Sequence, residues 1–199
     1  MTQTAENNGK AYFHRLHAVR VTNGAEKFGG PVVINASCFV SGQQLQRPGL
    51  LFENGNIYIA FGGNEDIDPY HGWVFSYRAS TLGLQDVWNS TPGGKEGSVW
   101  QGAAGIAADK NGELYLATAN GDWNGTTQFG QSAVHLSPSL TVVDYFTPFD
   151  WFTQNKGDKD LGSGGPLIVP DQKGNHPHEI VGCSKLNWVY VLDRDHMGH

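Results

Sequence analysis

The sequence predicts an all-β fold, a partial β-propeller whose four-stranded antiparallel blades repeat about every 57 residues. Glycine accounts for 27 of the 199 residues, alongside six tryptophans and seven tyrosines, a composition typical of a turn-rich β protein. Helical periodicity is almost absent, because Gly, Pro or Asn interrupts nearly every candidate window. Short alternating runs bounded by turn residues are frequent instead, which indicates strands.

Two hairpins open the two complete units. The stretch LLFENGNIYIAFGG (residues 50–63) contains Asn54-Gly55, a pair that favours a tight turn because both central residues need positive φ. The stretch GIAADKNGELYLATAN (residues 105–120) repeats this design. Both units continue into a third and a fourth strand, and their alignment pairs Tyr58 with Tyr115 and Trp88 with Tyr145.

These patterns divide the single domain, 1–199, into four units. We expect a half blade at 12–40, with the third and fourth strands of that unit in LHAVRVTNGAEKFGG. Complete blades follow at 48–92 and 100–148, and an incomplete blade at 162–195. A β-sandwich whose halves are similar by accident is the alternative, but the uniform offset favours the propeller.

The blade count predicts that the fold is incomplete. Two whole blades and two incomplete ones amount to fewer than the four to eight blades of a normal ring. A blade presents two apolar faces, so an isolated arc would expose apolar surface and strand edges. We therefore expect a fragment of a longer propeller or a homo-oligomer, and two copies would give six blades.

Charge and composition exclude several classes of function. A formal charge of −6 and a pI near 5.7 argue against a nucleic-acid partner. No apolar run is long enough for a membrane-spanning helix, and the first 15 residues do not resemble a signal peptide. Cys38 and Cys183 match no metal-binding spacing and are either two buried thiols or one disulfide.

Several stretches resemble the pyrroloquinoline-quinone-binding-like β-propeller repeat proteins of the quinoprotein alcohol dehydrogenase-like superfamily. The resemblance rests on RPGLLFENGNIYIAFGG, PYHGWVFSYRASTL, GELYLATANGDW, DLGSGGPLIVPDQ and VYVLDRDHMG. It implies a ring of seven or eight blades, of which half or more is missing here. It also implies a periplasmic or extracellular location.

In the enzymes of that superfamily a quinone cofactor lies over a calcium ion. It is stacked between a Trp and a disulfide of adjacent cysteines, beside a catalytic Asp. The resemblance puts Asn120, at the end of YLATAN, at a calcium-ligand position, and Trp100 near the region of the stacking Trp. The chain has no adjacent cysteines. The alternative is that Asn120 only caps a turn with its side chain.

Two further groups are candidates for a site. Asp122 and Trp123 follow Asn120 in the same loop and would join it as a metal ligand and a cofactor contact. Glu65, Asp66 and Asp68 supply several carboxylates within a short loop, which suits calcium. The loop lacks the glycine and the alternation of a calcium-loop motif, which favours an ordinary solvated acidic loop. Aromatic loop residues could also form a surface for a carbohydrate or another protein, with packing between blades as the alternative. These residues are Trp73, Trp100, Trp123 and Trp151.

Two functions remain open from the sequence. The first is a ligand- or partner-binding propeller module, with no catalytic residue identified. The second is a pyrroloquinoline-quinone- and calcium-dependent alcohol or sugar dehydrogenase completed by further blades or subunits. A third interpretation is an incomplete chain without independent function.

Overall fold

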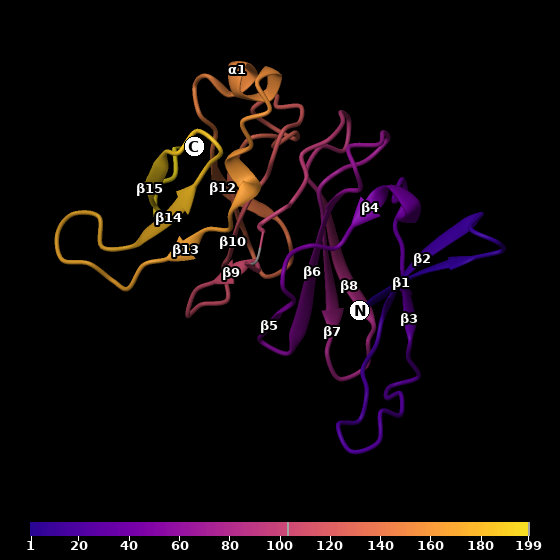
Figure 1. Ribbon diagram of the computed structural model, residues 1–199. Coiled ribbons are helices and arrows are strands. Elements are labelled where there is room, and N and C mark those ends of the chain that lie inside the picture. The colour runs from indigo at the N-terminus through magenta and orange to yellow at the C-terminus, as the bar shows by residue number, and fades with distance from the viewer. Residues whose placement is uncertain (103, 199) are drawn as a thin grey trace.

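The computed structural model describes residues 1–102 and 104–198 and consists of four small antiparallel sheets arranged as an arc (Figure 1). The first sheet contains β1 (Thr2–Glu6), β2 (Ala11–Leu16) and β3 (Val32–Ile34). The second sheet contains β4 (Gln44–Leu45), β5 (Leu51–Glu53), β6 (Asn56–Gly63), β7 (Trp73–Arg78) and β8 (Leu84–Asn89), and both β4 and β5 pair with β6.

The third and fourth sheets continue the arc. The third contains β9 (Ala107–Ala108), β10 (Leu114–Ala117), β11 (Ala133–Leu136) and β12 (Val142–Phe146). The fourth contains β13 (Leu167–Ile168), β14 (Glu179–Cys183) and β15 (Val189–Asp193). Two 3₁₀ turns, η1 (Ser41–Gln43) and η2 (Leu161–Ser163), and one short helix, α1 (Trp151–Lys156), complete the described structure. The all-β partial propeller that the sequence predicts is confirmed.

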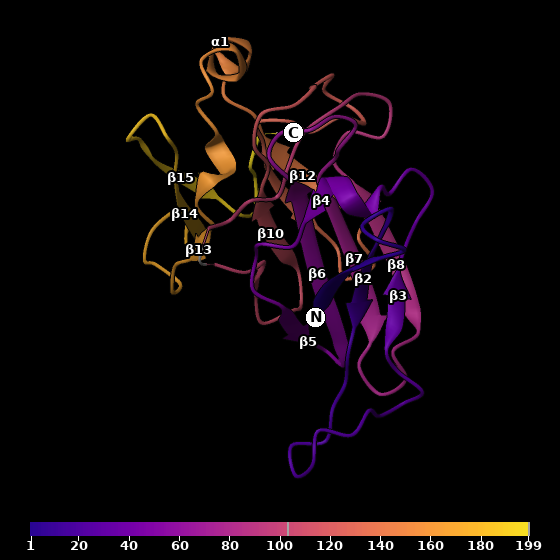
Figure 2. The same ribbon diagram turned by 45° about the vertical axis from the view of Figure 1, so that its right-hand side comes forward.

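Each sheet packs against its neighbour through its own apolar cluster. The first cluster joins Leu16 and Ile34 of the first sheet to Phe61 and Phe75 of the second. The second cluster lies between the second and third sheets, and the third lies between the third and fourth. Figures 1 and 2 show the second sheet between its two neighbours. Stacking neighbours is what a repeat unit with two apolar faces requires.

The register of the strands corrects part of the repeat alignment. Tyr58 and Tyr115 are equivalent, since each faces the next sheet along the chain. Trp88 also faces the next sheet, but Tyr145 faces the preceding one, so the predicted match of these two is wrong. Phe146, one residue later, has the equivalent position. Because side chains alternate along a strand, a slip of one residue reverses the face.

The N-terminal sheet also differs from the expectation. The sequence predicts two strands in the stretch 16–30, but after Leu16, the last residue of β2, this stretch forms a loop with a single bridge between Val19 and Glu26. Val19 and Val21 are exposed there, so their alternation does not reflect burial. The strands are instead β2 and β3, on either side of this loop, and β1 is an additional strand that the sequence did not suggest.

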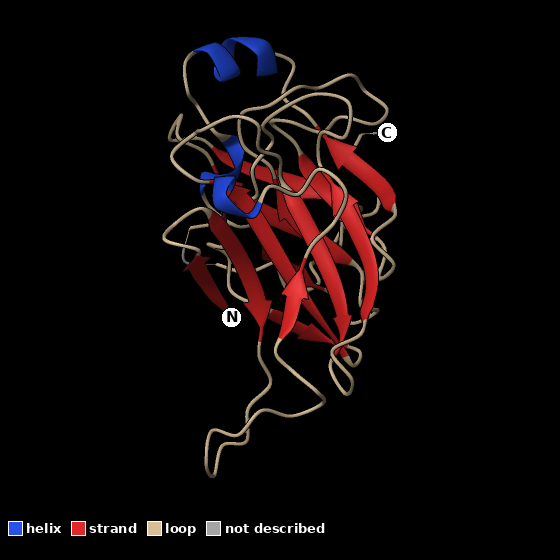
Figure 3. Ribbon diagram, turned by 90° about the vertical axis from the view of Figure 1, so that its right-hand side faces the viewer, coloured by secondary structure: helices blue, strands red, loops and turns tan. Residues whose placement is uncertain are grey.

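Loops at one end of the strands carry the polar residues of the cleft described below. Figure 3 shows α1 at this end of the molecule and the long loop between β2 and β3 at the opposite end. The segments that lead into β5 and β9 run side by side, with a parallel bridge between Gly49 and Gly105.

No helix among the described residues is long and apolar enough to cross a membrane. Cys38 and Cys183 are both free and both exposed, so neither the disulfide nor the pair of buried thiols is formed.

Candidate functional site

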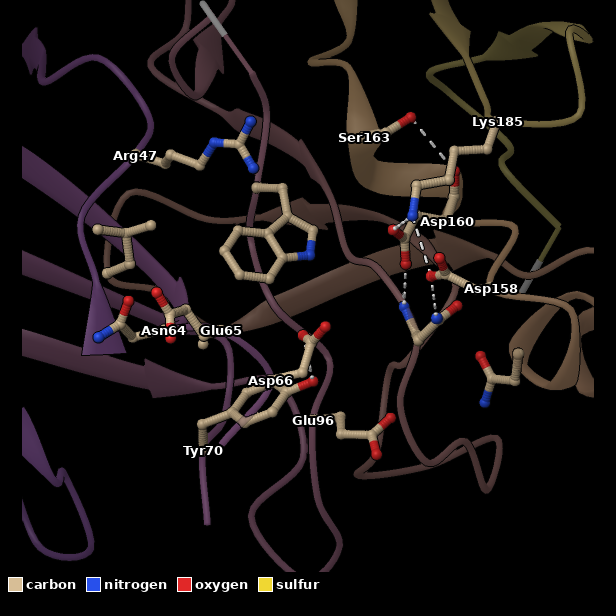
Figure 4. Close-up of a pocket in the computed structure, with 15 residues that line it drawn as sticks. Arg47, Asn64, Glu65, Asp66, Tyr70, Glu96, Asp158, Asp160, Ser163 and Lys185 are labelled. Atoms are coloured by element: carbon tan, nitrogen blue, oxygen red, sulfur yellow. Dashed lines mark hydrogen bonds and ion pairs between the residues drawn. The ribbon is translucent and has the colours of Figure 1, made fainter. Parts of the chain in front are cut away.

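An open cleft of about 800 Å³ lies where loops of the second, third and fourth sheets converge (Figure 4). One wall comes from the second sheet and includes Arg47, Glu65 and Tyr70. The opposite wall comes from the end of α1, the segment after it, and the turn between β14 and β15. Its polar residues are Asn155, Asp158, Asp160, Ser163 and Lys185. The cleft therefore combines segments that are far apart in the sequence.

Trp100 lies in the cleft and is half-buried. Gly62 makes its position possible, because a Cβ at residue 62 would lie 2.9 Å from the Trp100 ring. The guanidinium carbon of Arg47 is 5.4 Å from the centre of the indole, a distance typical of a cation–π contact. Trp100 thus presents an aromatic surface between the two polar walls.

Asn120 is held by hydrogen bonds on three sides. Its backbone N–H donates to Asp160 at 3.0 Å, and its side-chain amide donates to Asp158 at 2.9 Å. Its side-chain oxygen accepts a hydrogen bond from Gln131 at 3.0 Å. Asn155 on α1 adds a hydrogen bond of 2.7 Å to the carbonyl of Gly121. These contacts fix the loop after β10 against the segment that follows α1.

Lys185 closes this wall from the fourth sheet. Its ammonium lies 2.5 Å from Asp160 and 2.9 Å from Asp158 (Figure 4). Burial alone would lower the pKa of Lys185, but the hydrogen bonds to Asp160 and Asp158 outweigh it and raise the pKa above its usual range. Asp160 is 5% exposed, and the contact with Lys185 offsets the cost of burying its carboxylate.

The chain approaches closely behind Asp160. A Cβ at Gly162 would lie 2.6 Å from the carbonyl oxygen of Ala117, so only glycine fits there. The N–H groups of Gln101 and Gly102 donate to the carbonyls of Gly162 and Ser163. These bonds bring the segments of Trp100 and Asp160 together.

The wall from the second sheet is less constrained. Glu65 and Asp66 are exposed, and Asp66 accepts a hydrogen bond of 3.2 Å from Tyr70. Burial raises the pKa of Glu96, and although Lys95 opposes the shift, Asp68 and Asp122 add to it. Glu65, Asp66 and Glu96 all have positive φ, which is uncommon for residues with side chains and is found at functional sites.

The structure brings only some of the sequence candidates together. Asn120, Trp100, Glu65 and Asp66 line the cleft. Three candidates do not line it, namely Asp68, Asp122 and Trp123. The carboxylate of Asp122 accepts the backbone N–H of Lys95, and the indole of Trp123 packs beside that of Trp151 with ring centres 5.5 Å apart.

Sequence reasoning missed five charged residues of the cleft. They are Arg47, Glu96, Asp158, Asp160 and Lys185. One signal was available, because Asp158 and Asp160 directly precede the glycine-rich segment LGSGGPL that enters an inner strand. No comparable signal marks Lys185, which reaches the cleft from the turn after β14.

Comparisons with known proteins support the fold. No protein-family model and no curated protein matches the sequence. The quinohemoprotein alcohol dehydrogenase ADHIIG from Pseudomonas putida HK5 is similar in structure, with 18% identity, a TM-score of 0.70, and coverage of 92% of this chain and 31% of that one. A europium-containing methanol dehydrogenase is similar with 16% identity, a TM-score of 0.67, and coverage of 94% and 38%.

The chain therefore has the β-propeller fold of quinoprotein dehydrogenases, as the resemblance in its sequence predicted. It spans about a third of the length of these two proteins.

Proposed function

We propose that the chain is a ligand-binding propeller module whose cleft binds a hydroxyl-bearing molecule of the carbohydrate or polyol class. One observation carries this proposal: the indole of Trp100 lies between two walls rich in hydrogen-bonding groups. An aromatic ring can stack on the apolar face of a sugar, and carboxylates accept hydrogen bonds from its hydroxyls.

The charge of the cleft favours a neutral ligand over an anionic one. Five carboxylates line it, against the two cations Arg47 and Lys185. Repulsion from this excess of negative charge opposes binding of an anion. The volume of about 800 Å³ is in the range of small-molecule sites.

Calorimetric titration of the full chain tests this proposal. The ligands are a methyl glycoside, a linear polyol and a sugar acid as the anionic counterpart. We expect the neutral ligands to bind, and Trp100→Ala to weaken them at least tenfold. Trp188→Ala is the matched control, since Trp188 is half exposed and does not line the cleft. Equal weakening by both substitutions, or preference for the sugar acid, would contradict the proposal.

A quinone-dependent alcohol or sugar dehydrogenase is the second candidate, and its support is that both similar structures are dehydrogenases. The described residues, as placed, do not fit a calcium-held quinone. The oxygens of Asp158 and Asp160 that a calcium ion would need already contact the Lys185 ammonium, and the Asn120 oxygen accepts from Gln131. The cysteines are not adjacent.

Dye reduction separates the two candidates. A dehydrogenase would reduce an artificial electron acceptor with an alcohol or sugar only when pyrroloquinoline quinone and calcium are added. A binding module would bind the same sugar without reducing the dye. The assay includes the chain alone and the chain with each addition separately.

We also propose that further blades complete the cleft. The outer face of the fourth sheet exposes Leu167, Val189 and Val191, each by more than half, as an uncovered blade face would. Further propeller sequence or a second copy would cover it. Since residues 1–102 and 104–198 form four sheets, two copies would supply eight rather than the six blades expected from the sequence. By resemblance we propose a periplasmic or extracellular location.

A further inference from the structure

The ammonium of Lys185 occupies a position that would suit a metal ion. It lies between two carboxylates, 2.5 Å from an oxygen of Asp160 and 2.9 Å from one of Asp158 (Figure 4). Carboxylate and amide oxygens are the ligands that calcium and other hard cations prefer. The same oxygens therefore serve either an ammonium or a metal ion.

The surrounding bonds are arranged for the ammonium. The second oxygen of Asp160 accepts the backbone N–H of Asn120, and the side-chain amide of Asn120 donates to Asp158. The Asn120 oxygen is directed to Gln131, whose own oxygen accepts the N–H of Leu161 at 2.7 Å. A metal ion at this place would have to displace Lys185 and reverse the donor orientation of Asn120.

The backbone holds Lys185 there as well. Its N–H donates to the carbonyl of Asp160 at 3.1 Å. This bond ties the start of the turn between β14 and β15 to the ion-pair clamp, the name we give to Lys185 with Asp158 and Asp160. The side chain is 38% exposed, whereas that of Asp160 is 7% exposed. The ammonium thus neutralises the more buried carboxylate from the open side of the cleft.

We propose that Lys185 is the resident cation of this cleft and makes ligand binding independent of metal ions. An ammonium has three N–H donors, and Asp158 and Asp160 accept two of them. The third is available to an oxygen of the ligand. This inference rests on the proposed function only in treating the cleft as the ligand site.

Terbium binding tests the inference, because Trp100 in the same cleft can sensitise terbium luminescence. The full chain is titrated with terbium alone, as wild type, Lys185→Met, Lys185→Gln and Lys185→Arg. We expect saturable luminescence for the two neutral variants, with affinity at least tenfold above wild type. Lys185→Arg keeps the charge and is expected to behave like wild type. The double variant Asp158→Asn/Lys185→Met should lose most of the increase in terbium affinity that Lys185→Met alone produces.

Two outcomes would overturn the inference. One is saturable terbium binding by the wild type with the affinity of the neutral variants. The other is no gain in a neutral variant whose circular dichroism spectrum is unchanged. The second neutral variant decides the question if the first does not fold. Failure of the proposed function is separate, since it would appear as absence of sugar binding by the wild type, whatever terbium does.

Discussion

Two regions of the molecule bury polar groups: the cleft, and the interface that joins the first sheet to the second. They differ in whether those groups have hydrogen-bond or ion-pair partners. In the interface, His14 is 1% exposed, stacks on Phe61 with ring centres 5.0 Å apart, and has neither ring nitrogen hydrogen-bonded. In the cleft, Asp160 is 5% exposed and both its oxygens have partners. Of these two regions, the cleft is the one whose buried polar groups form a network, which is why we assign function there and packing to the interface.

The largest effect should come from the interface. Phe61→Ala removes a ring that is fully buried and contacts His14, Phe39 and Phe75. We expect a loss of about 3–5 kcal/mol in the free energy of unfolding, measured by urea denaturation. Phe52→Ala is the control, because Phe52 is 67% exposed and its loss should change stability little. Similar losses for both would contradict the assignment of this cluster as core.

Acid should weaken the same interface through His14. Burial lowers the pKa of His14 to about 4, from 6.5, so the folded state favours the neutral ring. The neutral ring therefore contributes about 3 kcal/mol to the free energy of unfolding above pH 6.5. This contribution is lost as the pH falls from 6.5 towards 4. Urea denaturation across this range checks it. His14→Phe should lose this part of the pH dependence, and an unchanged slope in the variant would refute the role of His14.

Within the cleft, the two carboxylates of the clamp should differ. Asp160→Asn removes the buried charge opposite Lys185, and we expect a loss of about 2–3 kcal/mol in the free energy of unfolding. Asp158→Asn should cost less than about 0.5 kcal/mol, because the Asp158 side chain is 75% exposed. Thermal and urea denaturation of the pair measure this contrast. Equal losses would mean that burial does not distinguish the two carboxylates.

A substitution beside Trp100 should destabilise the fold less than Asp160→Asn does, but it should clearly weaken sugar binding. Gly62→Ala places a methyl group against the Trp100 ring, which must move. We expect about 1–2 kcal/mol of destabilisation from this overpacking. Sugar affinity should fall about tenfold, measured by calorimetry, because the stacking surface is displaced. Gly182→Ala, at a position in β14 with open space around it and no positive φ, tests whether any glycine replacement has this effect.

The sequence predicted the interfaces better than the cleft, for a physical reason. The continuous apolar runs of β6 and β10 reflect burial on both faces of each strand, so the blades and their stacking could be recognised. The stretch 16–30 misled because its alternating valines are exposed. Asn120 and Trp100 could be named from local motifs. The partners of Asn120 could not, since Asp158 and Asp160 lie 38 and 40 residues away and meet it only through the packing of the third and fourth sheets.

The most direct test of the account is a nuclear magnetic resonance titration of the full chain, labelled at the indole nitrogens, with a methyl glycoside. The six tryptophans give separate reporters of the interfaces, the surface and the cleft. We expect the Trp100 resonance to shift with saturation, while those of the interface residues Trp73 and Trp88 and the surface residue Trp188 stay in place. A saturable shift at Trp188 without one at Trp100, or no shift at any indole, would contradict the assignment of the cleft as the ligand site.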